Sequence, residues 1–131
     1  MIALPPPKAA ILAQRDAILA ALRSMLPEDA VIGEALRLKP YETDGLSAYR
    51  QVPLAVVLPR TTAEVAAVLR YCSEMGIRVV PRGAGTSLSG GALPLADAVV
   101  IGLMRMNRIL EVDYENRLAV AKRFGATDAV N

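Results

Sequence analysis

The sequence predicts an α/β (α+β) protein in which an N-terminal helix precedes a small unit of parallel strands connected by a helix. Two observations carry this prediction. Residues 55–58 and 77–80 are short apolar runs rich in valine, typical of strands that are buried on both faces. An amphipathic helical pattern lies between them, and a strand-helix-strand connection of this length favours parallel strands.

The composition excludes several classes of function. The chain has 131 residues, of which 53% are hydrophobic and 21% charged, as expected for one globular domain. Its 15 basic and 13 acidic residues are mixed along the sequence, so there is no basic run of the kind that binds nucleic acid. We therefore expect no nucleic-acid partner.

The chain also lacks the usual catalytic and metal-binding side chains. It contains no histidine and a single cysteine, Cys72, which excludes Ser-His and Cys-His pairs and an internal disulfide. We expect no catalytic residue and no metal site here. The lone cysteine fits a reducing compartment, and no continuous apolar segment suits a signal peptide or a membrane span, which predicts a cytoplasmic protein.

The first fifty residues predict a helix and then an ordered loop region. One helix is expected over residues 8–26, because its apolar residues fall on one side: Ile11, Leu12, Ile18, Leu19, Leu22, Met25 and Leu26. Residues 30–51 have no sustained period. Tyr41, Asp44, Tyr49 and Arg50 are candidates to line a site in this loop region, although solvated loop residues are the commoner interpretation.

The central helix has clear start and stop signals. Thr61 and Glu64 form a capping-box pattern, and Gly76 suits the position after the helix end, near Glu74. The apolar stripe of this helix is Val65, Val68, Leu69 and Cys72. We expect the next strand to stop at Pro81, a third apolar run at 98–103, a short turn or helix at 104–109, a strand at 110–113, a turn at 114–116 and a return strand beginning at 118–121.

A glycine-rich stretch follows the second strand. Residues 81–94 hold four of the nine glycines, and successive glycine-rich backbone N–H groups can converge on an anion. The hydroxyls of Thr86, Ser87 and Ser89 could assist. The pattern is neither a Rossmann fingerprint, because Leu88 stands where the third glycine belongs, nor a Walker A loop. A glycine-rich hairpin without a ligand remains the alternative.

The stretch from Val80 to Pro94 resembles the pyrophosphate loop of FAD-linked oxidases of the vanillyl-alcohol oxidase and para-cresol methylhydroxylase type. Within that family it is most similar to the branch of glycolate oxidase and D-lactate dehydrogenase. The resemblance continues through residues 41–50, 55–59 and 106–113, and covers roughly residues 8–118.

This resemblance implies FAD as cofactor and the first subdomain of a PCMH-type FAD-binding domain, present incompletely. It divides the chain into residues 1–50, an FAD-binding subdomain at 51–119 and a tail at 120–131. It also implies a flavin-dependent 2-hydroxy-acid oxidase or dehydrogenase with an iron-sulfur partner subunit, held peripherally at the inner membrane through such partners. The implied cofactor contacts are Pro81, Arg82, Gly83, Ala84, Gly85, Thr86, Ser87, Leu88, Gly91 and Ala92.

The tail departs from this family pattern. Residues 120–131 are similar to a segment of zinc-dependent alcohol dehydrogenases, so we expect a fragment, a shifted reading frame or a chimera, inactive alone and binding FAD weakly. A non-catalytic nucleotide- or anion-binding module, or a subunit adaptor, is the alternative function. A remnant that self-associates through exposed apolar surface is a third.

Overall fold

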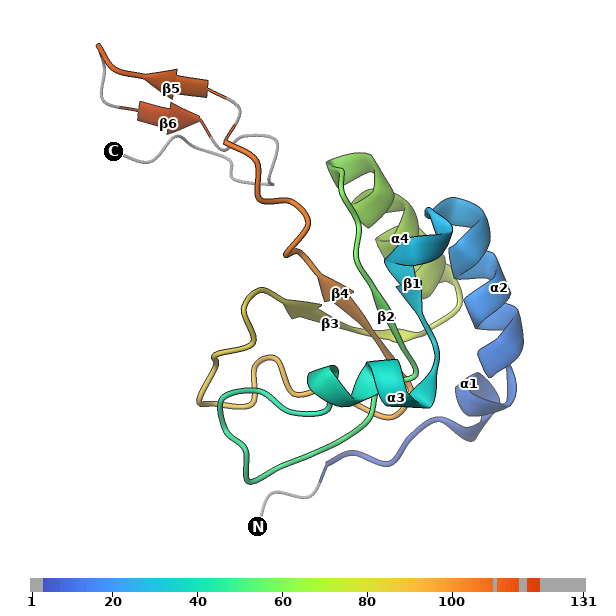
Figure 1. The fold of residues 1–131 in the computed structure, drawn as a ribbon. Coiled ribbons are helices and arrows are strands. Elements are labelled where there is room, and N and C mark those ends of the chain that lie inside the picture. Colours follow the sequence, from blue (N-terminus) through green and yellow to red (C-terminus); the bar gives the residue numbers. More distant parts are fainter. Residues whose placement is uncertain (1–3, 110, 116–117, 121–131) are drawn as a thin grey trace.

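The computed structural model describes residues 4–109, 111–115 and 118–120, and Figure 1 shows their arrangement. In this part of the chain, a four-stranded sheet has the order β1-β2-β4-β3, and a two-stranded hairpin pairs β5 with β6. The α-helices are α1 (Ala9–Ala13), α2 (Arg15–Met25), α3 (Ala35–Leu38) and α4 (Thr62–Glu74), and the short 3-10 helices are η1 (Glu28–Ala30) and η2 (Lys39–Tyr41). The strands are β1 (Val31–Ile32), β2 (Ala55–Val57), β3 (Arg78–Arg82), β4 (Ala98–Gly102), β5 (Glu111–Asp113) and β6 (Leu118–Val120). The predicted α/β class is confirmed.

Strands β1, β2 and β4 are buried on both faces, whereas β3 is partly buried. Side chains alternate along a strand, so each strand contributes to two clusters. Val57, Val99 and Ile101 pack into a cluster with apolar residues of α1, α2 and α4. Val56 and Val100, which are register partners, face the opposite side with Leu38 at the end of α3. Figure 1 shows α2 and α4 on one side of the sheet and α3 on the other.

The N-terminal helix is interrupted at Gln14, so the expected single helix is wrong. The side-chain amide of Gln14 donates to the Ala10 carbonyl over 3.1 Å, where the Gln14 backbone N–H would bond in a continuous helix. That N–H bonds to Ile11 O instead, also at 3.1 Å. This competition from the side chain separates α1 from α2. Most of the predicted apolar side is buried, but Leu12 is exposed.

Helix α4 begins and ends as predicted. Thr61 Oγ1 accepts from the Glu64 N–H over 3.2 Å, whereas the Glu64 carboxylate reaches the N–H of Arg60 rather than that of Thr61. Gly76 has a φ of 64°, which suits the residue after a helix. The buried stripe is narrower than predicted, because Val68 and Cys72 are fully buried but Leu69 is 46% exposed.

Strand β4 lies between the two strands that flank α4. It pairs in parallel with β2 on one side and with β3 on the other. The glycine-rich residues 83–97 therefore connect two parallel neighbours, so this connection is not the hairpin expected in the alternative, because a hairpin joins antiparallel strands. That the loop takes a ligand stays a prediction.

Strand β3 does not stop at Pro81, contrary to expectation. It continues to Arg82, with Pro81 in register with Ile101. β3 is an edge strand of this sheet, so the missing proline N–H on its outer side removes no ladder hydrogen bond.

The loop region at 30–51 contains a strand that the sequence pattern did not predict. Val31 and Ile32 form β1, which pairs antiparallel with β2. The pair is extended by the Leu58 N–H, which donates to Ala30 O over 2.8 Å. The strand was missed because two residues show no period, and its place is set by pairing with residues far along the chain.

Asp97 attaches the N-terminal segment to the start of the sheet. Its fully buried carboxylate accepts from the Lys8 backbone N–H over 2.9 Å and pairs with Arg78 Nη1 over 3.2 Å. Lys8 Nζ donates to Gly76 O over 2.7 Å. Both oxygens of this buried carboxylate are thus compensated, as a charge inside the protein requires.

The predicted strand and return strand near the end of the chain are confirmed as β5 and β6, joined by a turn at Tyr114 and Glu115. The expected atypical segment 120–131 lies almost entirely outside the described residues. Within the described part, no helix is both long and apolar enough to cross a membrane.

The packing of α4 makes a prediction about Cys72. Its side chain is fully buried against the sheet, and burial raises the pKa of the thiol to about 11. We expect the native protein to resist Ellman's reagent at pH 8 and the unfolded protein to react fully, because only the exposed thiolate reacts. The chain has one cysteine, so absorbance reports this site alone. Rapid reaction of the native protein would show that α4 detaches readily from the sheet.

Candidate functional site

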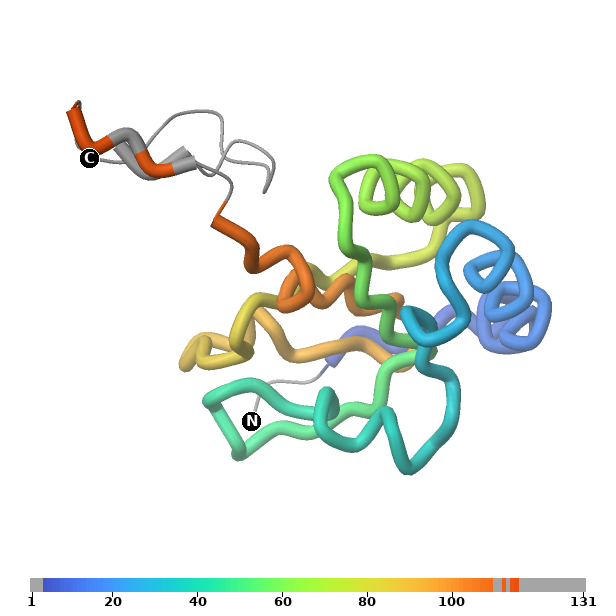
Figure 2. Tube along the Cα trace, turned by 45° about the horizontal axis from the view of Figure 1, so that its top comes forward, coloured from blue at the N-terminus to red at the C-terminus, as the bar shows by residue number. Residues whose placement is uncertain are grey.

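The glycine loop, residues 83–97, leaves the carboxyl end of β3 and returns to the amino end of β4. Figures 1 and 2 both show it running beside the segment that follows η2. In a parallel sheet the carboxyl ends of the strands form the edge where ligands usually bind. The loop therefore starts at the expected ligand edge.

Arg82, the last residue of β3, points into the protein. It is only 9% exposed, and its Nη1 donates to Thr43 O over 2.8 Å and to Ala92 O over 3.3 Å. Its guanidinium carbon lies 5.6 Å from the centroid of the Tyr41 ring, within cation-π range. One side chain thus joins the segment after η2 to the end of the glycine loop.

Two loop glycines adopt backbone angles that other residues avoid. Gly85 has a φ of 75° and Gly90 a φ of 77°. The space beside Gly85 is filled, because a Cβ there would clash with the Arg82 guanidinium. Gly83 differs, since a Cβ at Gly83 would meet nothing within 4 Å. The loop is therefore packed on its inner side and open at its beginning.

Gly45 brings a second backbone against the loop. A Cβ on Gly45 would lie 2.9 Å from the carbonyl oxygens of both Thr86 and Ser87. Backbone atoms cannot give way as a flexible side chain can, so only glycine allows this approach. An Asp-Gly pair is typical of a turn, but no local pattern shows which backbone such a turn meets.

The three hydroxyls proposed as anion ligands differ in their roles. Ser87 Oγ accepts from the N–H groups of Ser89 and Gly91 over 3.3 and 3.2 Å, which closes a turn within the loop. Thr86 and Ser89 are exposed, as is Leu88 between them. The structure thus brings together the predicted residues 81–92, with Ser87 stabilising the turn.

The backbone N–H groups of residues 83–88 have no hydrogen-bond acceptor among the described residues. No aspartate or glutamate occurs between Gly83 and Ala96, and the one carboxylate of the loop, Asp97, is fully buried at its far end. A run of backbone N–H groups without acceptors attracts an anion, and glycine leaves room for close approach. These residues fit a pyrophosphate, which presents several acceptor oxygens.

Asp44 is a buried carboxylate beside this arrangement. It is 6% exposed, and its Oδ1 accepts from the Leu46 N–H over 2.9 Å. Its Oδ2 is buried without a partner among the described residues. Of the other candidates in this segment, Arg50 forms an exposed ion pair with Glu42 at 3.3 Å.

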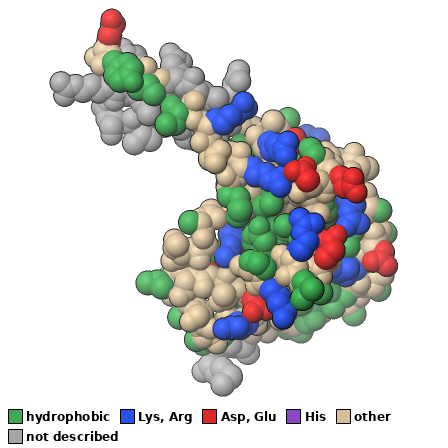
Figure 3. Space-filling model, in the orientation of Figure 1, with side chains coloured by type: hydrophobic (Ala, Val, Ile, Leu, Met, Phe, Trp, Pro, Cys, Tyr) green, Lys and Arg blue, Asp and Glu red, His purple; other side chains and the backbone are tan. Residues whose placement is uncertain are grey.

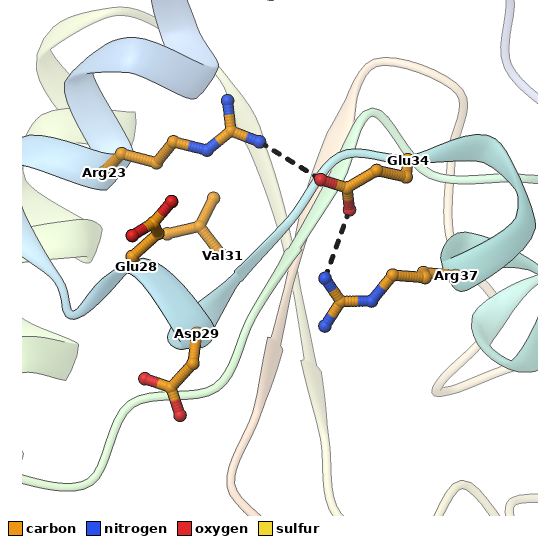
Figure 4. A pocket seen from close by; sticks show the side chains of 6 residues that line it. All are labelled: Arg23, Glu28, Asp29, Val31, Glu34 and Arg37. Atoms are coloured by element: carbon orange, nitrogen blue, oxygen red, sulfur yellow. Dashed lines mark hydrogen bonds and ion pairs between the residues drawn. The ribbon is translucent and has the colours of Figure 1, made fainter.

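Two surface pockets lie away from the glycine loop. The pocket in Figure 4, of about 560 Å³, is lined by Arg23, Glu28, Asp29, Val31, Glu34 and Arg37. Glu34 pairs there with Arg23 at 3.5 Å and Arg37 at 3.4 Å. Backbone N–H groups of Glu34 and Gly33, followed by Arg37 and Arg23, lower the pKa of the Glu34 carboxyl. Both arginines of this pocket are thus paired with the one carboxylate of Glu34.

The second pocket, of about 680 Å³, lies where α4 begins and β4 ends. Two of its arginines, Arg60 and Arg105, share the Asp29 carboxylate at 2.7 and 2.9 Å. Figure 3 shows basic and acidic side chains interspersed on the face that it displays. No group of three His, Cys, Asp or Glu residues among those described could hold a metal ion.

Comparison with known proteins identifies the family of this chain. The model of the family described as "FAD binding domain" matches residues 53–127, which is more than half of the chain. Glycolate oxidase subunit GlcD of Escherichia coli strain K12 is 45% identical over 105 residues, or 80% of this chain and 21% of that protein. The mitochondrial D-2-hydroxyglutarate dehydrogenase of Arabidopsis thaliana is 34% identical over 113 residues, or 80% of this chain and 20% of that protein. The chain therefore spans about a fifth of the length of these curated relatives.

The fold agrees with this assignment. The structure of p-cresol methylhydroxylase with bound substrate matches with a TM-score of 0.67 at 24% identity, over 82% of this chain and 21% of that chain. At this identity the match shows the fold alone, and that fold is the one expected from the resemblance. Sequence and fold together show that the chain belongs to the FAD-binding domain family, whose cofactor is FAD.

Proposed function

We propose that this chain supplies the pyrophosphate-binding portion of an FAD-dependent oxidoreductase that acts on a small 2-hydroxy acid such as glycolate or D-lactate. One observation carries the proposal: the backbone N–H groups of residues 83–88, which are exposed or half-buried residues at the carboxyl end of β3, have no acceptor among the described residues. Membership of the FAD-binding domain family supports FAD as the guest. Two relatives named for oxidising 2-hydroxy acids support the substrate class.

In this proposal, each residue that the family resemblance places at the cofactor either binds a phosphate or fixes the loop. The N–H groups from Gly83 to Leu88 donate to the phosphate oxygens, with the Thr86 hydroxyl as a further donor. Pro81 and Arg82 fix the start of the loop, and Gly91 and Ala92 fix its return. Bound FAD would supply the acceptor for the two electrons of the substrate. This chain has no histidine, so its own residues bind and orient the cofactor and leave proton transfer to other groups.

The remaining parts of the proposal concern organisation and partners. We assign FAD binding to residues 51–119, with residues 1–50 as a packing extension and 120–131 as a tail. We further propose a cytoplasmic protein that joins an iron-sulfur subunit and is peripheral at the inner membrane through its partners. Exposed apolar residues favour self-association, which sedimentation over a range of concentrations would measure: Leu36, Leu88, Ile109 and Tyr114.

Titration calorimetry tests FAD binding directly. We expect the purified chain to bind FAD with an affinity weaker than about 1 µM, because only the pyrophosphate loop contributes. Riboflavin, which lacks phosphate, should not bind measurably, and ADP should bind. Equal protection of the loop N–H groups from hydrogen exchange by phosphate, ADP and FAD would instead support the general anion-binding module. Binding of riboflavin as tight as that of FAD would contradict a pyrophosphate site.

A pair of glycine substitutions separates binding from packing. Gly83→Ala places a methyl group in open space on the proposed ligand side, so we expect stability within about 0.5 kcal/mol of wild type but weaker FAD binding. Gly45→Ala places a methyl against the Thr86 and Ser87 carbonyls, so we expect a loss of about 1–3 kcal/mol in the free energy of unfolding. Urea denaturation and calorimetry measure both effects. Unchanged FAD binding in Gly83→Ala would place the cofactor elsewhere.

A further inference from the structure

Arg82 is the one buried cation in the described part of the chain, and its partners are not those of a phosphate ligand. Its Nη1 bonds two main-chain carbonyls, Thr43 O at 2.8 Å and Ala92 O at 3.3 Å. Among the described residues it forms no ion pair with a carboxylate. An arginine that binds phosphate directs its guanidinium toward the ligand, whereas this one is directed away from solvent.

The guanidinium of Arg82 also fills the space beside Gly85. It lies against Gly85, at the position where any other residue would place its Cβ. Because Gly85 has a φ of 75°, this contact coincides with the bend that turns the loop away from β3. The Tyr41 ring, 5.6 Å from the guanidinium carbon, further restricts its position.

The two carbonyl contacts connect the segments that enclose the loop. Thr43 lies two residues before Gly45, whose backbone packs on Thr86 and Ser87. Ala92 is buried and lies just after the turn that Ser87 closes at Gly91. From its position at the end of β3, Arg82 thus contacts Gly85 near the start of the loop, Ala92 further along it, and Thr43 in the segment that packs against it.

We propose that Arg82 is a positioning residue: it holds the pyrophosphate loop in its binding conformation before FAD arrives, and its charge does not contact the phosphates. This inference rests on the proposed function of the loop. Prior ordering of the loop removes the entropy cost of ordering it on binding, and so raises affinity without a further contact.

The substitution Arg82→Lys distinguishes positioning from direct contact. Lysine keeps the positive charge, but it lacks the planar guanidinium that lies beside the Tyr41 ring and fills the space against Gly85. We therefore expect Arg82→Lys to weaken FAD binding at least tenfold and to leave the salt dependence of the remaining affinity unchanged. In the FAD-free protein, hydrogen exchange at residues 85–92 should become faster. Arg70→Lys is the matched control, because Arg70 is exposed on α4, and it should change neither measurement.

A second variant keeps the inference testable if Arg82→Lys does not fold. Tyr41→Leu leaves the arginine in place and removes the ring against it, so faster loop exchange and a smaller loss of FAD affinity are expected. Wild-type FAD affinity and loop exchange in either folded variant would overturn the positioning role. A wild-type affinity in Arg82→Lys, with a weaker salt dependence in Arg82→Gln, would show direct phosphate contact. If the wild-type chain does not bind FAD at all, the proposed function fails, while loop exchange in the FAD-free variants still tests Arg82.

Discussion

The parallel pairing of β3 with β4 is the constraint on which the glycine loop depends. Because the two strands run in the same direction, residues 83–97 must connect the carboxyl end of β3 to the amino end of β4, and no helix lies within this connection. Such a connection has few internal hydrogen bonds of its own. Side chains at its two ends supply the order instead: Arg82 where the loop begins, and Asp97, paired with Arg78, where it ends.

Local signals predicted those parts of the fold whose causes are local. The run 55–58, the cap at Thr61 and the glycine at position 76 each depend on neighbouring residues, and each appeared near its predicted place. Two of the failures have tertiary causes: β1 exists through pairing with β2, and β3 continues through Pro81 because it is an edge strand. The interruption at Gln14 is local, since its side chain bonds to the carbonyl of Ala10 only four residues earlier.

The candidate site shows the same division. The sequence indicated the glycine stretch and its family, because the residues proposed to bind through their backbone are recognisable as a run of glycine, serine and threonine. The supports of the loop were not recognisable from the sequence. Gly45 resembled an ordinary turn residue, and Arg82 belonged to the predicted contacts without any sign that its side chain faces inward. Each support acts across a large sequence separation, which no local pattern encodes.

The proposed anion binding requires a rigid loop. Phosphate sites at a helix N-terminus gain from the helix dipole, but the residues that follow 83–88 do not form a helix. Binding then depends on several N–H groups pointing to one place, and a flexible glycine loop would lose that convergence through its own entropy. Two contacts limit this freedom: Gly45 packs against the Thr86 and Ser87 carbonyls, and the Arg82 guanidinium packs against Gly85. The space beside Gly83 is open and is available to the proposed ligand. The glycines therefore have two different roles in the proposed site. Gly45 and Gly85 allow close packing within the protein, whereas Gly83 leaves room for the cofactor.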